Sequence, residues 1–198
     1  VDDIKRMVDE FSSFARMPKA RVAPDDLAET VRQALFLMRV GHPAVAFEDE
    51  IPISMPATFD RRLLSQALTN VIKNATEGLE EGQESPRIRV TLRDIDGVAT
   101  IDVIDNGRGF PAEHRQRLLE PYMTTRAEGT GLGLPIVQKI LEDHGGGIEL
   151  LDAVNAGVWE KGAWVRLAFP RDGAAEAPDA EPATGAPVTP ATNEMRSH

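Results

Sequence analysis

Two runs of residues decide how this chain is interpreted. They are Asp105-Asn106-Gly107-Arg108-Gly109, directly after an alternating apolar segment, and Gly129-Thr130-Gly131-Leu132-Gly133-Leu134, at the start of a helical pattern. A carboxylate at a strand end can accept a hydrogen bond from an exocyclic amine, and glycines beside it let the backbone approach a flat ring. Glycines that open a helix expose backbone N–H groups where the helix dipole favours an anion. The first run favours an amine-bearing ring and the second favours phosphate.

Each run also has alternative interpretations. The pattern D-x-G-x-G is weak by itself, because a turn or a calcium loop could look similar. The obvious competitor for the second run is a dinucleotide-binding fingerprint. That alternative fails on context, since the glycines do not lie between a strand and a helix near the start of a βαβ unit, and no lysine completes a phosphate-binding loop.

Two asparagines lie one turn apart within a strongly apolar helical pattern that Asp60 caps and that runs to about Leu79. Asn70 and Asn74, at spacing i and i+4, project from the same helix face. Amides in such a place cost desolvation unless they have partners. A single asparagine is most simply explained as a hydrogen-bonding core residue. Two in register can offer oxygen atoms to a hard cation that also bridges phosphates, as magnesium does in nucleotide sites.

A long irregular segment separates the two glycine runs. Residues 110–129 are too many for a plain connection in a compact domain, and they are predicted to form a functional lid. The segment ends with Thr124-Thr125-Arg126, just before the second glycine run. In a chain of formal charge −10, that guanidinium is well placed to meet a phosphate group.

Length and composition restrict the remaining classes of function. The chain has 198 residues, with 22 basic and 32 acidic side chains, which leaves no broad positive field for nucleic acid or an anionic membrane. It has no cysteine, so disulfides and thiol catalysis are excluded. Its apolar runs are too short to span a bilayer, and its first residues lack the apolar core of a signal peptide. The chain as given is predicted to be soluble and cytoplasmic, and its start at Val1 within a helical pattern suggests a fragment of a longer protein.

Hydrophobic periodicity predicts an α+β, two-layer sandwich with a largely antiparallel sheet and its helices on one face. Apolar residues at spacings of three and four predict a helix over residues 1–17, which Pro18 ends. Asp96-Gly97 predicts a hairpin turn. The predicted helices cover residues 24–42, 60–79, 112–118 and 131–144, and the predicted strands cover 44–50, 55–59, 87–93, 98–104, 147–152 and 162–169.

The chain is expected to divide into three parts. Residues 1–18 form the end of a helix whose apolar seam needs a partner. Residues 19–170 form the folded domain. Residues 171–198 hold seven alanines and four prolines but no Leu, Ile, Phe, Tyr or Trp, so they are predicted to be disordered.

In chain order, the asparagine pair, the D-x-G-x-G run, the lid and the second glycine run resemble the N, G1, F and G2 boxes of the catalytic ATP-binding domain of sensor histidine kinases. The resemblance covers about residues 20–170. Residues 8–18 resemble the second helix of the dimerisation hairpin in the nitrogen-regulation, NtrY/NtrB-type branch. The chain departs from the usual lid pattern at Leu119 and Tyr122, which replace common phenylalanines.

The resemblance implies a Bergerat-type fold that binds ATP under the lid, with Mg²⁺ on Asn74 and the adenine amine on Asp105. Catalytic roles are expected for Asn70 and Arg126. It also implies a homodimeric full-length kinase, membrane-anchored in some members, that acts with a response regulator. The nucleotide contacts expected from the resemblance are Asn70, Asn74, Asp105, Gly107, Gly109, Thr124, Thr125, Arg126, Gly129, Thr130, Gly131, Leu132, Gly133 and Leu134.

Three classes of function remain open. Hydrolytic relatives of the gyrase and chaperone type place a glutamate four residues before the magnesium asparagine, and here that position is Asn70. An amide is no general base, so transfer to a supplied nucleophile is favoured over fast hydrolysis. Each of the four histidines is better explained structurally, so the acceptor histidine is expected to lie on a segment that precedes this fragment. The alternatives are an ATP-hydrolysing switch and a nucleotide-binding module without turnover.

Overall fold

The computed structural model describes residues 18–111, 113, 115–123 and 130–173. The predicted helix over residues 1–17, the tail beyond residue 173, and the lid residues 124–129 lie outside the described residues. Among the described residues, no helix is long and apolar enough to cross a membrane.

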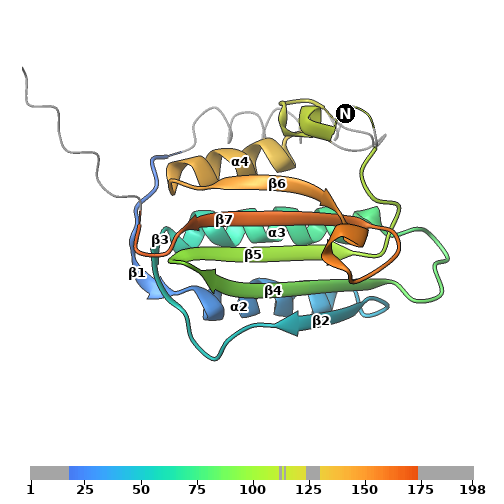
Figure 1. Ribbon diagram of the computed structural model, residues 1–198, viewed down its shortest axis with the longest axis horizontal. Coiled ribbons are helices and arrows are strands. Elements are labelled where there is room, and N and C mark those ends of the chain that lie inside the picture. The colour runs from blue at the N-terminus through green and yellow to red at the C-terminus, as the bar shows by residue number, and fades with distance from the viewer. Residues whose placement is uncertain (1–17, 112, 114, 124–129, 174–198) are drawn as a thin grey trace, which may run out of the picture.

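A five-stranded mixed sheet forms one layer of the fold (Figure 1). In spatial order the strands are β2 (Ala46–Glu50), β4 (Arg87–Ile95), β5 (Val98–Asp105), β7 (Ala163–Pro170) and β6 (Gly147–Asp152). The pairing of β2 with β4 is parallel, and the other three pairings are antiparallel. This arrangement confirms the predicted sheet and its Asp96-Gly97 hairpin.

Three helices cover one face of this sheet and form the second layer (Figure 1). They are α2 (Leu27–Gly41), α3 (Arg61–Gly78) and α4 (Gly133–Asp143). The side chains of Asp26 and Asp60 cap the first two helices by accepting hydrogen bonds from backbone N–H groups in the first turn. The apolar pattern of α3 is buried, and it belongs to one core cluster with alternate residues of β5 and β7. The buried residues of this pattern are Leu63, Leu64, Leu68, Val71, Ile72 and Ala75.

Three local predictions need correction. Residues 23–26, predicted in part as a helix start, form strand β1 (Ala23–Asp26), which pairs antiparallel with β3 (Pro56–Phe59). The helix predicted over residues 112–118 is a 3₁₀ helix, η1 (Arg115–Leu119). The glycine-rich helix begins two residues later than predicted, because Gly131 adopts a left-handed φ of 68°.

A buried histidine joins the start of α3 to the end of α4. His144 Nε2 accepts a hydrogen bond from the backbone N–H of Asp60 at 2.9 Å, and Nδ1 lies 2.7 Å from the carbonyl oxygen of Ile140. Burial opposes ionisation of Asp60, but hydrogen bonds from the backbone N–H groups of Arg21 and Leu63 hold its pKa below the ordinary value of 3.8. The structural interpretation of His144 is confirmed, and this junction fixes the two helices that border the site.

Candidate functional site

The residues that the sequence singles out converge at one end of the sheet, where β5 and α3 end and α4 begins (Figure 1). Asn70 Nδ2 donates to the carbonyl oxygen of Gly133 at 3.4 Å, which joins α3 to α4. A Cβ placed on Gly78, at the end of α3, would stand 3.8 Å from Oδ2 of Asp105. The structure therefore brings the asparagine pair, the carboxylate and the start of α4 together from segments far apart in the sequence.

Asp105 supplies the carboxylate of this site, and hydrogen bonds from backbone N–H groups fix the orientation of its side chain. It lies on the sheet face that the helices cover, and its exposed fraction is only 3%. Its Oδ1 accepts hydrogen bonds from the backbone N–H of Gly107 at 2.9 Å and from that of Ala163 at 3.2 Å. An ionised carboxylate only accepts hydrogen bonds, so this group can select a ligand that presents a donor.

Close backbone packing explains the two glycines after Asp105. A Cβ on Gly107 would lie 2.2 Å from the carbonyl oxygen of Gly78, and the N–H of Arg108 donates to the same oxygen at 3.1 Å. Gly109 has a φ of 78° and faces the backbone of Gly162. These glycines hold the loop against α3 and the start of β7. The sequence predicted an approach to a flat ring but did not indicate this packing role.

Asn70 and Asn74 are half-buried and face the start of α4. A Cβ on Gly133 would lie 3.6 Å from Nδ2 of Asn74, an ordinary van der Waals distance, so the start of α4 lies directly beside this amide. The amides therefore lie at the border of the two helices, where their oxygen atoms have the chemistry that a hard cation requires.

The second glycine run contributes backbone groups to the site. Leu132 is fully buried in the core, and Leu134 packs partly against it, so their side chains serve packing. The prediction of Leu132 and Leu134 as ligand contacts is thus restricted to their main-chain atoms. Leu132, the N-cap residue of α4, makes no side-chain capping hydrogen bond to the backbone N–H groups of the first turn.

The described part of the lid touches this run. Tyr122 donates its backbone N–H to the carbonyl oxygen of Gly131 at 3.1 Å, and a Cβ on Gly131 would lie 2.6 Å from the carbonyl carbon of Tyr122. Thr130 follows the undescribed residues directly. Thr124, Thr125, Arg126 and Gly129 lie outside the described residues, so their predicted roles at the phosphate end stay predictions.

Three site residues were missed by sequence reasoning: Gly78, Gly162 and Ala163. Gly162 has a φ of 126°, and a Cβ there would lie 1.8 Å from the carbonyl oxygen of Asp105. No local pattern indicates that contact. Gly78 did have a signal, because it follows Asn74 by one more turn on the same face of the helix.

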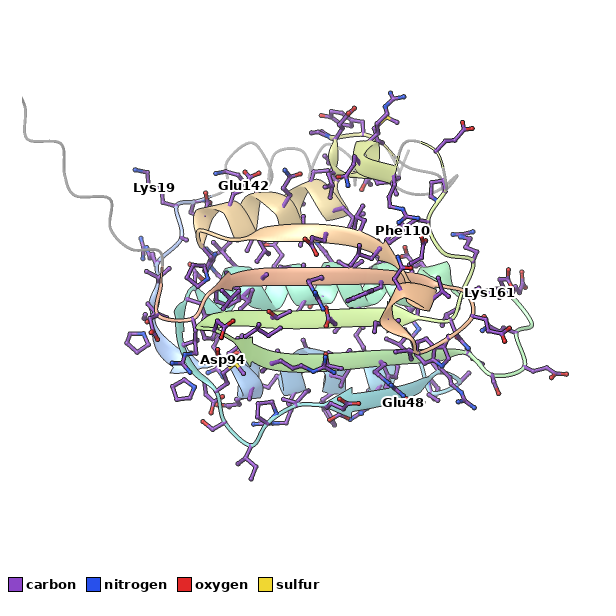
Figure 2. The ribbon with its side chains drawn as sticks, in the orientation of Figure 1. Lys19, Glu48, Asp94, Phe110, Glu142 and Lys161 are labelled. Carbon is purple, nitrogen blue, oxygen red and sulfur yellow. The ribbon has the colours of Figure 1, made fainter. Side chains whose placement is uncertain are left out.

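The loops around the site are tied to one another. Lys161 forms an ion pair with Glu80 at 2.8 Å, which connects the segment before β7 to the segment after α3. Phe110 and Lys161 mark this end of the sheet in Figure 2, opposite Lys19 and Asp94. The cation of Lys161 is already paired with a carboxylate.

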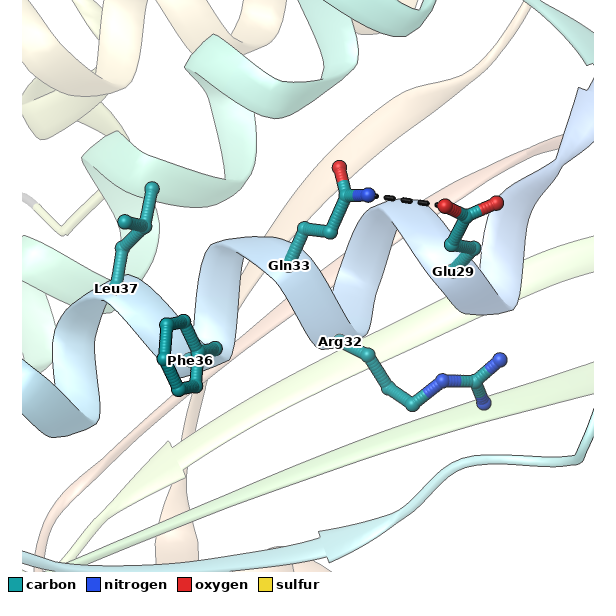
Figure 3. Close-up of a pocket in the computed structure, with 5 residues that line it drawn as sticks. All are labelled: Glu29, Arg32, Gln33, Phe36 and Leu37. Atoms are coloured by element: carbon teal, nitrogen blue, oxygen red, sulfur yellow. Dashed lines mark hydrogen bonds between the residues drawn. The ribbon is translucent and has the colours of Figure 1, made fainter.

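A separate groove lies on α2 (Figure 3). This α2 groove has a volume of about 390 Å³ and is lined by Glu29, Arg32, Gln33, Phe36 and Leu37. The guanidinium of Arg32 is engaged by the carbonyl oxygens of Pro52 and Ile53 at 2.7 and 2.8 Å. The groove contains none of the residues that the sequence singled out, and its lining is mainly apolar.

Comparisons with known proteins identify the family of the chain. Residues 59–173 match the family model described as histidine kinase-, DNA gyrase B-, and HSP90-like ATPase. The nitrogen regulation protein NtrY of Azorhizobium caulinodans is 58% identical over 186 residues, which are 92% of this chain and 23% of that protein. The chain spans about a quarter of the length of the curated relatives it matches.

Solved structures of histidine kinases are also similar to this chain. A mycobacterial sensor histidine kinase, MprB, has 26% identity and a TM-score of 0.68 over 78% of this chain and 100% of that chain. Full-length ShkA in complex with AMPPNP has 26% identity and a TM-score of 0.70 over 88% of this chain and 37% of that chain. The expected fold class and the resemblance are confirmed. The chain belongs to the family of histidine kinase-, DNA gyrase B- and HSP90-like ATPases.

Proposed function

We propose that this chain is the ATP-binding catalytic domain of a two-component sensor histidine kinase of the NtrY type. In this role it transfers the γ-phosphoryl group of ATP to a histidine on a dimerisation hairpin. The observation that carries the proposal is the site in which Asp105 faces the end of α3 while Asn70 and Asn74 face the start of α4. Family membership and the 58% identity to an NtrY protein support it.

The two ends of the site suit the two ends of ATP. At the ring end, the Asp105 carboxylate accepts a hydrogen bond from the adenine amine, while the Gly107 and Ala163 amides hold its other oxygen. At the phosphate end, the N-terminus of α4 supplies backbone N–H groups and the positive end of the helix dipole. Thr124, Thr125 and Arg126 are proposed to add hydroxyl groups and a guanidinium there.

Magnesium is proposed to bind at Asn74. Among the described residues, no group of three or more His, Asp or Glu side chains could hold a metal ion by itself. An amide oxygen fits a hard cation that takes its remaining ligands from phosphate and water, so the residues present are compatible with Mg²⁺. When bound, the ion neutralises negative charge on the phosphates.

The residue at position 70 bears on whether the site transfers the phosphoryl group to a protein histidine or to water. Asn70 cannot accept a proton as a general base, and its amide is hydrogen-bonded to the carbonyl oxygen of Gly133. A water molecule beside it is therefore poorly activated, whereas a supplied imidazole needs no deprotonation by the site. The two alternatives, an ATP-hydrolysing switch and a binding module without turnover, are distinguished by the experiment below.

The partners of the whole protein are part of the same proposal. Residues 1–18 are proposed to end the second helix of the dimerisation hairpin, and residues 19–170 to form the catalytic domain. The full-length protein is proposed to act as a homodimer that phosphorylates a response regulator, with this domain in the cytoplasm.

Incubation with γ-labelled ATP, magnesium and a separately supplied acceptor hairpin tests the proposal. The chain should label the hairpin, and Asn74→Asp should slow labelling far more than it weakens ATP binding. Asn155→Asp is the control for the added charge, because Asn155 is exposed and none of the site contacts described above involves it. Release of free phosphate without labelling would favour the ATPase switch, and binding without either product would favour the binding module.

A further inference from the structure

One arginine connects the described part of the lid to an edge strand of the sheet. Arg115 is the first residue of η1, and its Nη2 donates to Oδ1 of Asp152 at 2.6 Å. Its Nη1 lies 3.5 Å from the carbonyl oxygen of Leu150, and its guanidinium stands 5.7 Å from the centre of the Phe110 ring. Leu150 and Asp152 belong to β6, 35 and 37 residues farther along the chain.

These contacts fix the guanidinium of Arg115 from three sides. The side chain is only 22% exposed, so its ion pair with Asp152 is less screened by solvent than a pair at the open surface. The hydrogen bond within this pair is charge-assisted, and the aromatic face of Phe110 also attracts the cation. Arg115 therefore fixes the position of η1 relative to β6.

The residues after Arg115 connect this anchor to the second glycine run. We call residues 115–123 the lid base. Within it, η1 packs against α4 (Figure 1), and Leu118 and Leu119 lie against the hydrophobic core. Near its end, the backbone N–H of Tyr122 donates to the carbonyl oxygen of Gly131. A displacement of the lid base would therefore reach the backbone that leads into α4.

The contact between Tyr122 and Gly131 includes a strained residue. Tyr122 has a φ of 68°, in the left-handed region that is costly for a bulky side chain. Such a conformation persists only where the surrounding structure holds it. Gly131 holds Tyr122 from one side, and Arg115 holds the start of the same segment from the other. Without the anchor, Tyr122 can relax and leave Gly131.

We infer that Arg115 is a positioning residue for the phosphate end of the site: its contacts with β6 hold the lid base where Tyr122 supports the second glycine run. The inference rests on the proposed function, since it assigns the phosphate groups to the start of α4. Because Arg115 acts on this end alone, its loss should weaken binding of a triphosphate more than binding of a monophosphate.

Nucleotide binding by Arg115→Met tests the inference, because methionine removes the cation but keeps an apolar stem beside Phe110. In calorimetry with magnesium, the dissociation constant for ATP should rise roughly five- to thirtyfold, the factor by which the strain of one left-handed residue can shift an equilibrium. The dissociation constant for AMP, measured by amide chemical-shift titration, should stay close to the wild-type value. Without nucleotide, the amide signal of Gly131 should shift, whereas that of Ala163 should not.

Arg171→Met is the matched control. Arg171 forms a comparable ion pair with Asp94 at 2.5 Å, at the opposite end of the sheet (Figure 2). Its loss removes a guanidinium and an ion pair without touching the lid base. The affinity for ATP should therefore stay unchanged in this variant.

Two further variants test whether the pair acts as a unit, and thermal melting checks the fold of each. Asp152→Ala removes the carboxylate partner and should weaken ATP binding as Arg115→Met does. The double variant should bind ATP no more weakly than the weaker single variant, since both changes remove one interaction. Arg115→Lys should restore part of the affinity, because an ammonium group can still pair with Asp152.

The outcomes separate the inference from the proposed function. Wild-type affinity for ATP in folded Arg115→Met or Asp152→Ala, an equal loss for AMP and ATP, or additive losses in the double variant would overturn the inference and leave the proposed function intact. If the wild-type chain and Arg171→Met also failed to bind ATP, both the inference and the proposed function would be wrong.

Discussion

Gly162→Ala should damage both the fold and the nucleotide site through one contact. The Cβ of the new alanine would lie 1.8 Å from the carbonyl oxygen of Asp105, which is far inside van der Waals distance. Gly162 cannot simply move away, because its own carbonyl oxygen accepts a hydrogen bond from the N–H of Ala153 at 3.0 Å. The start of β7 and the end of β5 must separate instead.

The expected cost follows from the contacts that this separation breaks. An L residue in a left-handed conformation costs about 1–2 kcal/mol. Loss of the hydrogen bond from the Ala163 N–H to the Asp105 carboxylate adds about 1–3 kcal/mol, because the acceptor is charged and buried. We therefore expect Gly162→Ala to lower the free energy of unfolding by about 2–5 kcal/mol, a large part of the stability of an ordinary domain.

Urea unfolding followed by circular dichroism measures this loss, and the same loop supplies the control. Gly157 has a φ of 66° and no atom within 4 Å of its Cβ position. Gly157→Ala should therefore cost only the backbone term, about 1–2 kcal/mol, and leave ATP affinity unchanged. Equal destabilisation by the two substitutions, with equal ATP affinity, would refute the argument that Gly162 positions Asp105.

Three further predictions concern single side chains. Asp26 accepts hydrogen bonds from the Ser54 hydroxyl and from backbone N–H groups that include those of Met55 and Glu29, and these bonds lower its pKa from 3.8 to about 2. Its stabilising contribution is therefore present above pH 3.8 and lost as pH falls to 2. Urea unfolding of Asp26→Ala should show a deficit of about 1–2 kcal/mol at pH 7 that narrows over this range, and a deficit independent of pH would contradict it. His144→Phe leaves the buried N–H of Asp60 without its acceptor and should cost about 1–3 kcal/mol in urea unfolding, whereas unchanged stability would remove His144 from the junction. Asp105→Asn should reduce the preference for ATP over GTP in calorimetry, because the amide can present a donor to the adenine amine, and an unchanged preference would remove Asp105 from the ring end of the site.

Local patterns were sufficient to predict most of the elements. The apolar spacing of α3, its cap at Asp60 and the Asp96-Gly97 turn are all properties of neighbouring residues, and each matches the structure. The same approach failed at residues 23–26, where a proline followed by two aspartates is typical of a helix start. These residues form a strand instead, because they pair with the distant strand β3. Of the three residues, Asp26 alone acts as a helix start, as the N-cap of α2.

The site was predictable in its chemistry but not in its packing. Asp105 and the two asparagines were found because each is a polar side chain in an apolar pattern. Gly162 was missed because its importance depends on a contact between segments far apart in the sequence, whereas Gly78 was missed although it follows Asn74 by one turn on the same helix face. The parallel pairing of β2 with β4 is a long-range contact of the same kind. The burial of Leu132 was not predicted either, since its place in a glycine run hid its membership of the core.

An amide chemical-shift titration with ADP and magnesium tests the central claim most directly. If the nucleotide lies between Asp105 and the start of α4, the amide signals of Gly107, Ala163 and Gly133 should shift together on titration, while that of Gly41 should stay in place. Shifts confined to the α2 groove, with the signals of Gly107 and Ala163 unchanged, would contradict the account.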